Sequence, residues 1–98
     1  MLSITWEADE MGNGIFKARE NEEMIGVMRA HISGKIMTIL HTEVDPAHEG
    51  KGIAHQLFDR MLVYARETHL DVVPRCPFVL AQFRKNPSLY LDIWKTKN

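Results

Sequence analysis

The sequence predicts a mixed α+β fold with a mostly antiparallel sheet, one long helix after a Gly-x-Gly loop, and one or two short C-terminal helices. Three observations support this class. The first half alternates strand-compatible residues with short turns, the region from about 52 to 68 has helical periodicity, and a Gly-x-Gly step separates the two patterns. With 98 residues and 45% hydrophobic content, the chain is expected to form a single domain spanning 1–98.

The first half predicts four strands, at 4–6, 15–19, 24–32 and 36–44. Turns are expected at Met11–Gly14, Glu20–Glu22 and Ser33–Lys35, because Asn and Gly tolerate the positive φ that tight turns need. These strands follow one another through short turns, so they predict an antiparallel meander.

In the strand at 36–44, alternation gives each residue a predicted face. It places Met37, Ile39, His41 and Glu43 on one face of the sheet, and the intervening residues on the other.

The second half predicts helices around one more strand. Ile53, Leu57, Met61 and Ala65 recur at helical spacing, which predicts an amphipathic helix from about Gly52 to Thr68. A short buried strand is expected at 70–74. Pro77 suits the first position of a helix expected from about 78 to 85, and a last turn or helix, capped by Ser88, should run to Trp94.

Composition excludes several classes of function. A formal net charge of −1 provides no broad basic surface, so nucleic acid is not expected as a partner. No apolar run approaches the roughly 20 residues that cross a bilayer, and the acidic first ten residues do not resemble an export signal. We therefore expect a cytoplasmic protein without a membrane partner, in which Lys95 and Lys97 form a solvated tail. The five histidines lack metal-binding spacing, and no metal is expected.

The loop Glu49–Ala54 carries the clearest functional signal. It joins a strand to the start of an amphipathic helix, where free N–H groups and the helix dipole favour an anion. A Walker loop needs Ser or Thr after its lysine, whereas Gly52 follows Lys51 here. A dinucleotide fingerprint needs a third glycine, but His55 stands at that place. ATP and NAD are therefore not the expected ligands.

Three blocks in this order resemble the small, single-domain branch of the Gcn5-related N-acetyltransferases (GNAT). They are His41–Val44, Gly50–Ala54 and Val72–Phe78. The resemblance implies a sheet whose two central strands splay apart to admit the pantetheine arm of acetyl-CoA, and a loop whose N–H groups hold its pyrophosphate. The cofactor-binding residues that it implies are Glu43, Val44, Glu49, Gly50, Lys51, Gly52, Ile53 and Ala54.

One residue departs from the family pattern. The superfamily loop usually opens with Gln or Arg, and Glu49 stands there in this sequence. A carboxylate beside two phosphates is unfavourable unless it points outward, so Glu49 is expected to weaken cofactor binding while Lys51 offsets part of the effect.

Glu43, His41 and Cys76 are the candidate catalytic residues. Glu43 can act as general base, directly or through water, if the fold buries it, and otherwise it is a surface carboxylate. His41 either shares the proton transfer or is structural. Cys76 precedes a predicted helix start beside Arg75, which favours a thiolate able to accept an acetyl group; the alternative is a small buried hydrophobe.

The resemblance implies an acetyl-CoA-dependent N-acetyltransferase that acts on an unidentified amine, either a small molecule or a protein. The transfer would be direct or would pass through the cysteine. The alternative is a non-catalytic acyl-CoA-binding or protein-interaction module with the same fold.

Overall fold

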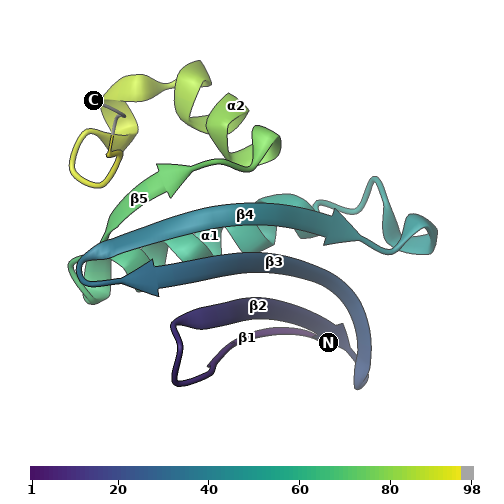
Figure 1. The fold of residues 1–98 in the computed structure, drawn as a ribbon. Coiled ribbons are helices and arrows are strands. Elements are labelled where there is room, and N and C mark those ends of the chain that lie inside the picture. Colours follow the sequence, from purple (N-terminus) through teal and green to yellow (C-terminus); the bar gives the residue numbers. More distant parts are fainter. Residues whose placement is uncertain (96–98) are drawn as a thin grey trace.

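The computed structural model describes residues 1–95, and Figure 1 shows their fold. The mixed α+β class predicted from the sequence is confirmed. The elements are, in order, β1 (Leu2–Ala8), β2 (Asn13–Glu20), β3 (Glu23–Ser33), β4 (Ile36–Val44), the short 3-10 helix η1 (Pro46–His48), α1 (Ile53–Glu67), β5 (Asp71–Pro74), α2 (Pro77–Lys85) and a second 3-10 helix, η2 (Pro87–Tyr90).

The sheet has the strand order β1-β2-β3-β4-β5. The first four strands form the predicted antiparallel meander, whereas β5 lies parallel to β4. A parallel neighbour requires a crossover connection, and α1 supplies it. β4 and β5 pair only from Ile36 to Ile39 on β4, after which the two strands diverge (Figure 1). β4 and β5 thus splay apart as the family resemblance implies, but among residues 1–95 β5 is the outermost strand, so the pair is not central as expected.

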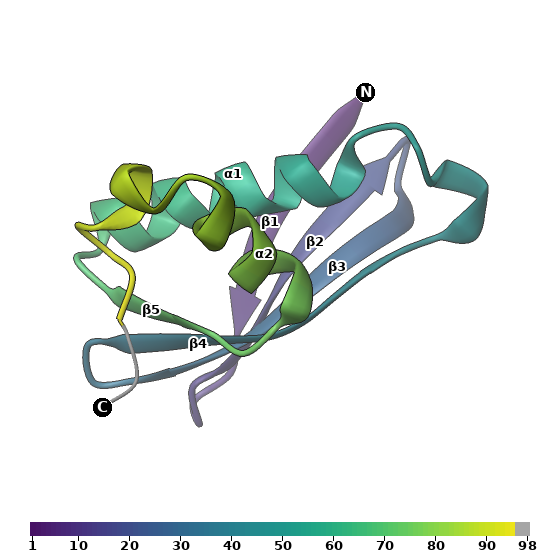
Figure 2. The same ribbon diagram turned by 90° about the horizontal axis from the view of Figure 1, so that it is seen from above.

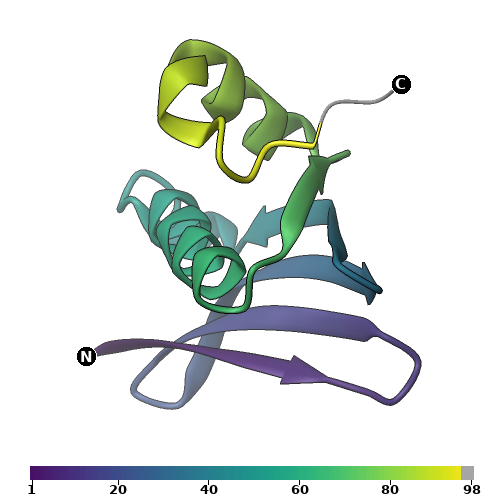
Figure 3. The ribbon, with the colours of Figure 1, turned by 90° about the vertical axis from the view of Figure 1, so that its left-hand side faces the viewer.

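Both α-helices lie on the same face of the sheet (Figures 2 and 3). Leu57, Met61 and Ala65 of α1 are fully buried, as are Phe16 and Met28 on the facing strands. Burial of one large apolar side chain contributes about 1.5–3 kcal/mol, so this layer holds α1 in place. No helix of residues 1–95 covers the opposite face, which we call the open face.

A bulge in β4 corrects the prediction from alternation. The pairing with β3 skips Leu40, which is an extra residue of β4. One inserted residue reverses the faces to which later side chains point. Met37 and Ile39 are therefore buried under the helices, whereas His41 and Glu43 lie on the open face. The predicted common face for all four residues is wrong, although His41 and Glu43 do share a face with each other.

Gly26 allows α1 to approach the end of the sheet closely. A Cβ at this position would lie 3.1 Å from Cγ2 of Ile53 and 3.4 Å from Cδ1 of Leu57. Both of these residues belong to the first half of α1. The missing side chain thus lets the first half of α1 lie close to β3 at Gly26, which pairs with Val44 at the C-terminal end of β4.

The C-terminal elements follow the prediction with one correction. α2 runs from Pro77 to Lys85, with Pro77 at its first position as expected. The predicted cap at Ser88 is wrong, because Asn86 is the N-cap of η2. Proline favours the first helical position, so Pro87 moves the start of this turn ahead of Ser88.

The segment after η2 is attached to the outer edge of β5. Trp94 forms a parallel bridge with Val72, and the N–H of Lys95 donates to the Val72 carbonyl at 2.8 Å. The backbone of Lys95 is therefore fixed against β5. The prediction that Lys95 belongs to a solvated tail is wrong for its backbone. Lys97 lies outside the described residues. None of the helices among residues 1–95 has the length and apolarity needed to span a bilayer.

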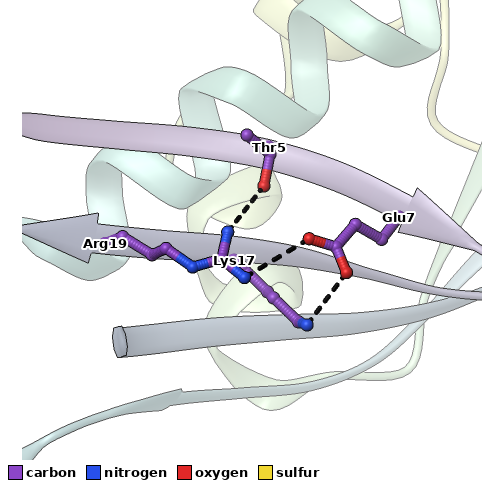
Figure 4. A network of polar contacts seen from close by, with 4 residues as sticks. All are labelled: Thr5, Glu7, Lys17 and Arg19. Atoms are coloured by element: carbon purple, nitrogen blue, oxygen red, sulfur yellow. Dashed lines mark hydrogen bonds and ion pairs between the residues drawn. The ribbon is translucent and has the colours of Figure 1, made fainter. Parts of the chain in front are cut away.

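The open face of β1 and β2 carries an ion network (Figure 4). Glu7 accepts hydrogen bonds from Lys17 at 2.9 Å and from Arg19 at 3.4 Å, and Arg19 also donates to Thr5 at 3.2 Å. The hydrogen bond from Lys17 is the main cause that lowers the pKa of Glu7. Exposed ion pairs contribute little to stability, so strand pairing and the core hold these strands.

Truncation of the α1 core residue Leu57 tests this packing. Leu57→Ala is expected to lower the free energy of unfolding by about 2–5 kcal/mol, because a buried leucine leaves a cavity. Val63→Ala on the same helix is the control, since Val63 is 48% exposed, and it should change stability by less than about 0.5 kcal/mol. Urea denaturation measures both, and equal losses would contradict the assignment of the buried helix face.

Candidate functional site

The site begins where β4 and β5 part. The N–H groups of Arg75 and Cys76 both donate to the Ile39 carbonyl, at 3.0 and 2.9 Å. Beyond this point, residues 40–44 of β4 have no strand partner on the β5 side within the described chain. Backbone groups along that edge are therefore available to a ligand that adds to the sheet.

The loop after β4 presents free amides at the start of α1. Gly50 and Gly52 have φ angles of 83° and 79°, and no atom lies within 4 Å of a Cβ built on either residue. Gly52, the predicted first residue of the helix, is its N-cap and offers no side-chain cap. The first helical hydrogen bond runs from Gln56 N–H to the Gly52 carbonyl at 3.1 Å. The N–H groups of residues 53–55 thus have no helical partner and carry the positive end of the dipole.

These amides border a cleft of about 450 Å³, which we call the α1 cleft. Six of the eight residues predicted to bind the cofactor line it, whereas Glu43 and Lys51 do not. The lining residues are Val44, His48, Glu49, Gly50, Gly52, Ile53, Ala54, His55 and Phe78.

Sequence reasoning missed three residues of this wall, His48, His55 and Phe78. His55 lies in the first turn of α1 and Phe78 in the first turn of α2, and their rings contact each other edge to face with centroids 5.3 Å apart. His55 Nε2 also lies 3.3 Å from Oε1 of Gln82, so it links α1 to α2. Nothing in the sequence marks His55 and Phe78 as neighbours, because they meet only through tertiary packing.

The loop itself is shaped by Asp45. Its Oδ1 accepts a hydrogen bond from the N–H of Ala47 at 3.2 Å, which forms a tight turn after β4. Its Oδ2 lies 3.5 Å from Nδ1 of His48, within ion-pair distance, yet the geometry makes no hydrogen bond and Nδ1 is buried without a partner. The contact between Asp45 and His48 is therefore weak, and the Asp45–Ala47 turn defines the loop.

The charge of the α1 cleft is carried by one side chain. Glu49 lines the cleft, and none of the lysines or arginines among residues 1–95 does. Lys51 is exposed and does not line the cleft. The lining therefore does not support the prediction that Lys51 offsets part of the effect of Glu49. An anion in this cleft would depend on backbone N–H groups and the helix dipole, and Glu49 would oppose it.

The three candidate catalytic residues lie on opposite sides of the sheet at β4. His41 Nε2 lies 3.9 Å from Oε1 of Glu43, and their side chains are 56% and 71% exposed on the open face. Glu43 is thus exposed, whereas its predicted role as general base requires burial. Cys76 is 2% exposed at the N-cap of α2, with Sγ 3.3 Å from Oγ1 of Thr42 on the helix-covered face. The structure pairs His41 with Glu43 and Cys76 with Thr42, and the backbone of β4 lies between the pairs.

Residues 15–93 match the family model of the GCN5-related N-acetyl-transferases. No curated protein sequence matches the chain.

Solved acetyltransferase structures share the fold. The chain is 25% identical to a ribosomal-protein-alanine N-acetyltransferase from Brucella melitensis biovar Abortus 2308, with a TM-score of 0.65 over 92% of this chain and 66% of that one. A GNAT family acetyltransferase from Elizabethkingia anophelis with acetyl-CoA bound is 14% identical, with a TM-score of 0.64 over 74% and 63%. The PaiA N-acetyltransferase from Thermoplasma acidophilum in complex with coenzyme A is 14% identical, with a TM-score of 0.60 over 74% and 48%. The chain therefore spans no more than 66% of the length of these three proteins.

Proposed function

Because this chain belongs to the GCN5-related N-acetyltransferase family, we propose that it binds acetyl-CoA in the α1 cleft and transfers the acetyl group to an amine. One observation carries the proposal. Val44, at the end of the partnerless edge of β4 at 40–44, lines the same cleft as the first residues of α1, 53–55, whose amides are free. Two of the similar structures contain acetyl-CoA or coenzyme A. We further propose that residues 1–98 act as one domain in the cytoplasm.

The residues present fit this cofactor. We propose that the backbone of Glu43 and Val44 pairs with the pantetheine arm, and that the amides of Gly50–Ala54 hold the pyrophosphate. Open space beside Gly50 and Gly52 lets phosphate oxygens reach the backbone. A volume of about 450 Å³ is within the usual range of ligand pockets. When bound, acetyl-CoA supplies an acetyl group activated as a thioester.

His41 and Glu43 are proposed to handle the proton of the acceptor. An ammonium group must lose a proton before its nitrogen can attack. The two side chains lie 3.9 Å apart on the open face, where an acceptor can reach them from solvent.

For Cys76 we propose a covalent route. Its thiolate would attack the thioester carbonyl, so that an S-acetyl bond forms and the coenzyme A thiolate leaves and takes up a proton. The amine would then attack the S-acetyl group and regenerate the thiol. The position of Cys76 at a helix N-terminus, where the gap between β4 and β5 closes, supports this role. Its burial, at 2% exposure within the hydrophobic core, favours instead the alternative of a small buried hydrophobe.

A non-catalytic acyl-CoA-binding or protein-interaction module is the second candidate function. The exposure of His41 and Glu43 favours it, since general bases are commonly tuned by burial. Glu49 in the wall of the cleft also favours it, because a carboxylate there weakens cofactor binding.

Gly52→Ala tests the amide site. Alanine at a φ of 79° costs about 1–2 kcal/mol, and relief of that strain displaces the first amides of α1. Gly34→Ala is the matched control, with a φ of 59°, open space and a position away from the cleft. Urea denaturation should show similar losses of stability. Calorimetry should show coenzyme A affinity reduced by more than about tenfold only for Gly52→Ala, and equal affinities would count against the site.

Replacement of Glu49 tests the electrostatics of the cleft. Glu49→Arg removes a carboxylate from the wall and adds a cation, so coenzyme A should bind about fivefold more tightly at low salt. Glu67→Arg at the far end of α1 makes the same change in net charge and should leave the affinity nearly unchanged. Unchanged or weaker binding by Glu49→Arg would contradict the placement of the phosphates.

Cys76→Ala separates the covalent route from direct transfer. After incubation with acetyl-CoA, mass spectrometry should detect one added acetyl group on the wild-type protein and none on Cys76→Ala, which should also fail to acetylate amines. A thermal unfolding curve checks that the variant folds. Full amine acetylation by Cys76→Ala would eliminate the covalent route, and acetyl-CoA binding without any transfer would favour the module. Failure of the wild-type protein to bind acetyl-CoA would contradict both functions.

A further inference from the structure

A second cleft, of about 700 Å³, lies between the end of β5, α2 and the segment after η2. Arg75, Arg84 and Lys95 line it together with Leu80 and Trp94. We call it the basic cleft. None of its lining residues belongs to the α1 cleft, so the two are separate sites.

The basic cleft concentrates positive charge in a chain that is not basic overall. Among residues 1–95, three cations and no carboxylate line it, whereas the formal net charge of the protein is −1. Within residues 1–95, none of the three cations forms an ion pair. By contrast, Arg66 on α1 donates to Asp92 at 2.9 Å. The cations of the basic cleft are thus available to an external anion.

Three different chain segments fix the backbone positions from which these exposed cationic side chains extend. The N–H of Arg75 donates to the Ile39 carbonyl at 3.0 Å, and the N–H of Lys95 donates to the Val72 carbonyl at 2.8 Å. Arg84 lies in the last turn of α2. Fixed backbone anchors lower the entropy lost when charged side chains converge on a ligand.

The apolar wall of the cleft is also anchored. The ring of Trp94 packs against that of the fully buried Phe83, with centroids 5.3 Å apart. Trp94 remains only partly buried, so part of its ring is available to the cleft beside Leu80. Aromatic side chains held in this way provide rigid contact area for an apolar ligand group.

We propose that the basic cleft binds a small organic anion in which a carboxylate or phosphate is joined to an apolar group. The guanidinium groups of Arg75 and Arg84 match the oxygens of either head group, and Lys95 adds a third charge. Trp94 and Leu80 contact the apolar part. Binding does not require acetyl-CoA, because the residues involved lie outside the α1 cleft.

Titrations of the full chain followed by NMR test this site directly. The probes are 3-phenylpropanoate, phenyl phosphate and the neutral 3-phenylpropanamide. The two anions are expected to shift the indole N–H of Trp94 and the amides near Arg75 in a saturable way, while the Trp6 indole serves as an internal reference. The anion that binds more tightly identifies the head group, and added salt should weaken both. Equal shifts with the neutral amide, or no saturable shift with either anion, would overturn the proposal.

Charge variants confirm which residues bind. The double variant Arg84→Gln/Lys95→Gln should weaken binding of the preferred anion by about tenfold. Lys85→Gln is the matched control, because Lys85 is the exposed neighbour of Arg84 outside the cleft, and it should bind like the wild type. Both proteins should retain wild-type affinity for coenzyme A, so failure here is distinct from failure of the acetyl-CoA proposal. Equal anion affinity for the double variant and the control would refute the site.

Discussion

The separation of β4 from β5 after Ile39 is the constraint on which the rest of the site depends. Two proline residues help to explain it. Pro74, the last paired residue of β5, has no N–H to extend the ladder, and Pro77 starts α2 and takes the chain away from the sheet. The amides between them both bond to the Ile39 carbonyl, which closes the end of the gap. On the opposite side of β4 from the gap, Gly26 of β3 lets α1 approach the sheet beside Val44, which lines the α1 cleft together with residues 53–55.

β4 divides the proposed chemistry between its two faces. The bulge at Leu40 places Thr42 beside Cys76 under the helices, and it leaves His41 and Glu43 in contact with solvent. A carrier site for the acyl group and a proton-accepting pair would thus lie on opposite sides of one strand.

The two clefts also differ in how they would hold an anion. The α1 cleft offers backbone amides beside a carboxylate, whereas the basic cleft offers three cationic side chains.

Much of this fold could be predicted from local pattern. The bounds of β4 match the prediction because both ends carry turn residues, and α1 differs only in that Gly52 and Thr68 are its caps. The bulge could not be predicted, because the residues of 36–44 are compatible with either face of the sheet. Their pattern therefore does not show that Leu40 is an extra residue. The contact of His55 with Phe78 depends on packing between α1 and α2, which no spacing in the sequence encodes. The binding and catalytic roles of individual residues stay predictions.

A crystal structure of the protein grown with coenzyme A tests the central claim most directly. Pyrophosphate oxygens are expected within hydrogen-bond distance of the amides of residues 53–55, and the pantetheine arm is expected along the edge of residues 40–44. Coenzyme A bound elsewhere, or strand pairing between β4 and β5 that continues beyond Ile39, would contradict it.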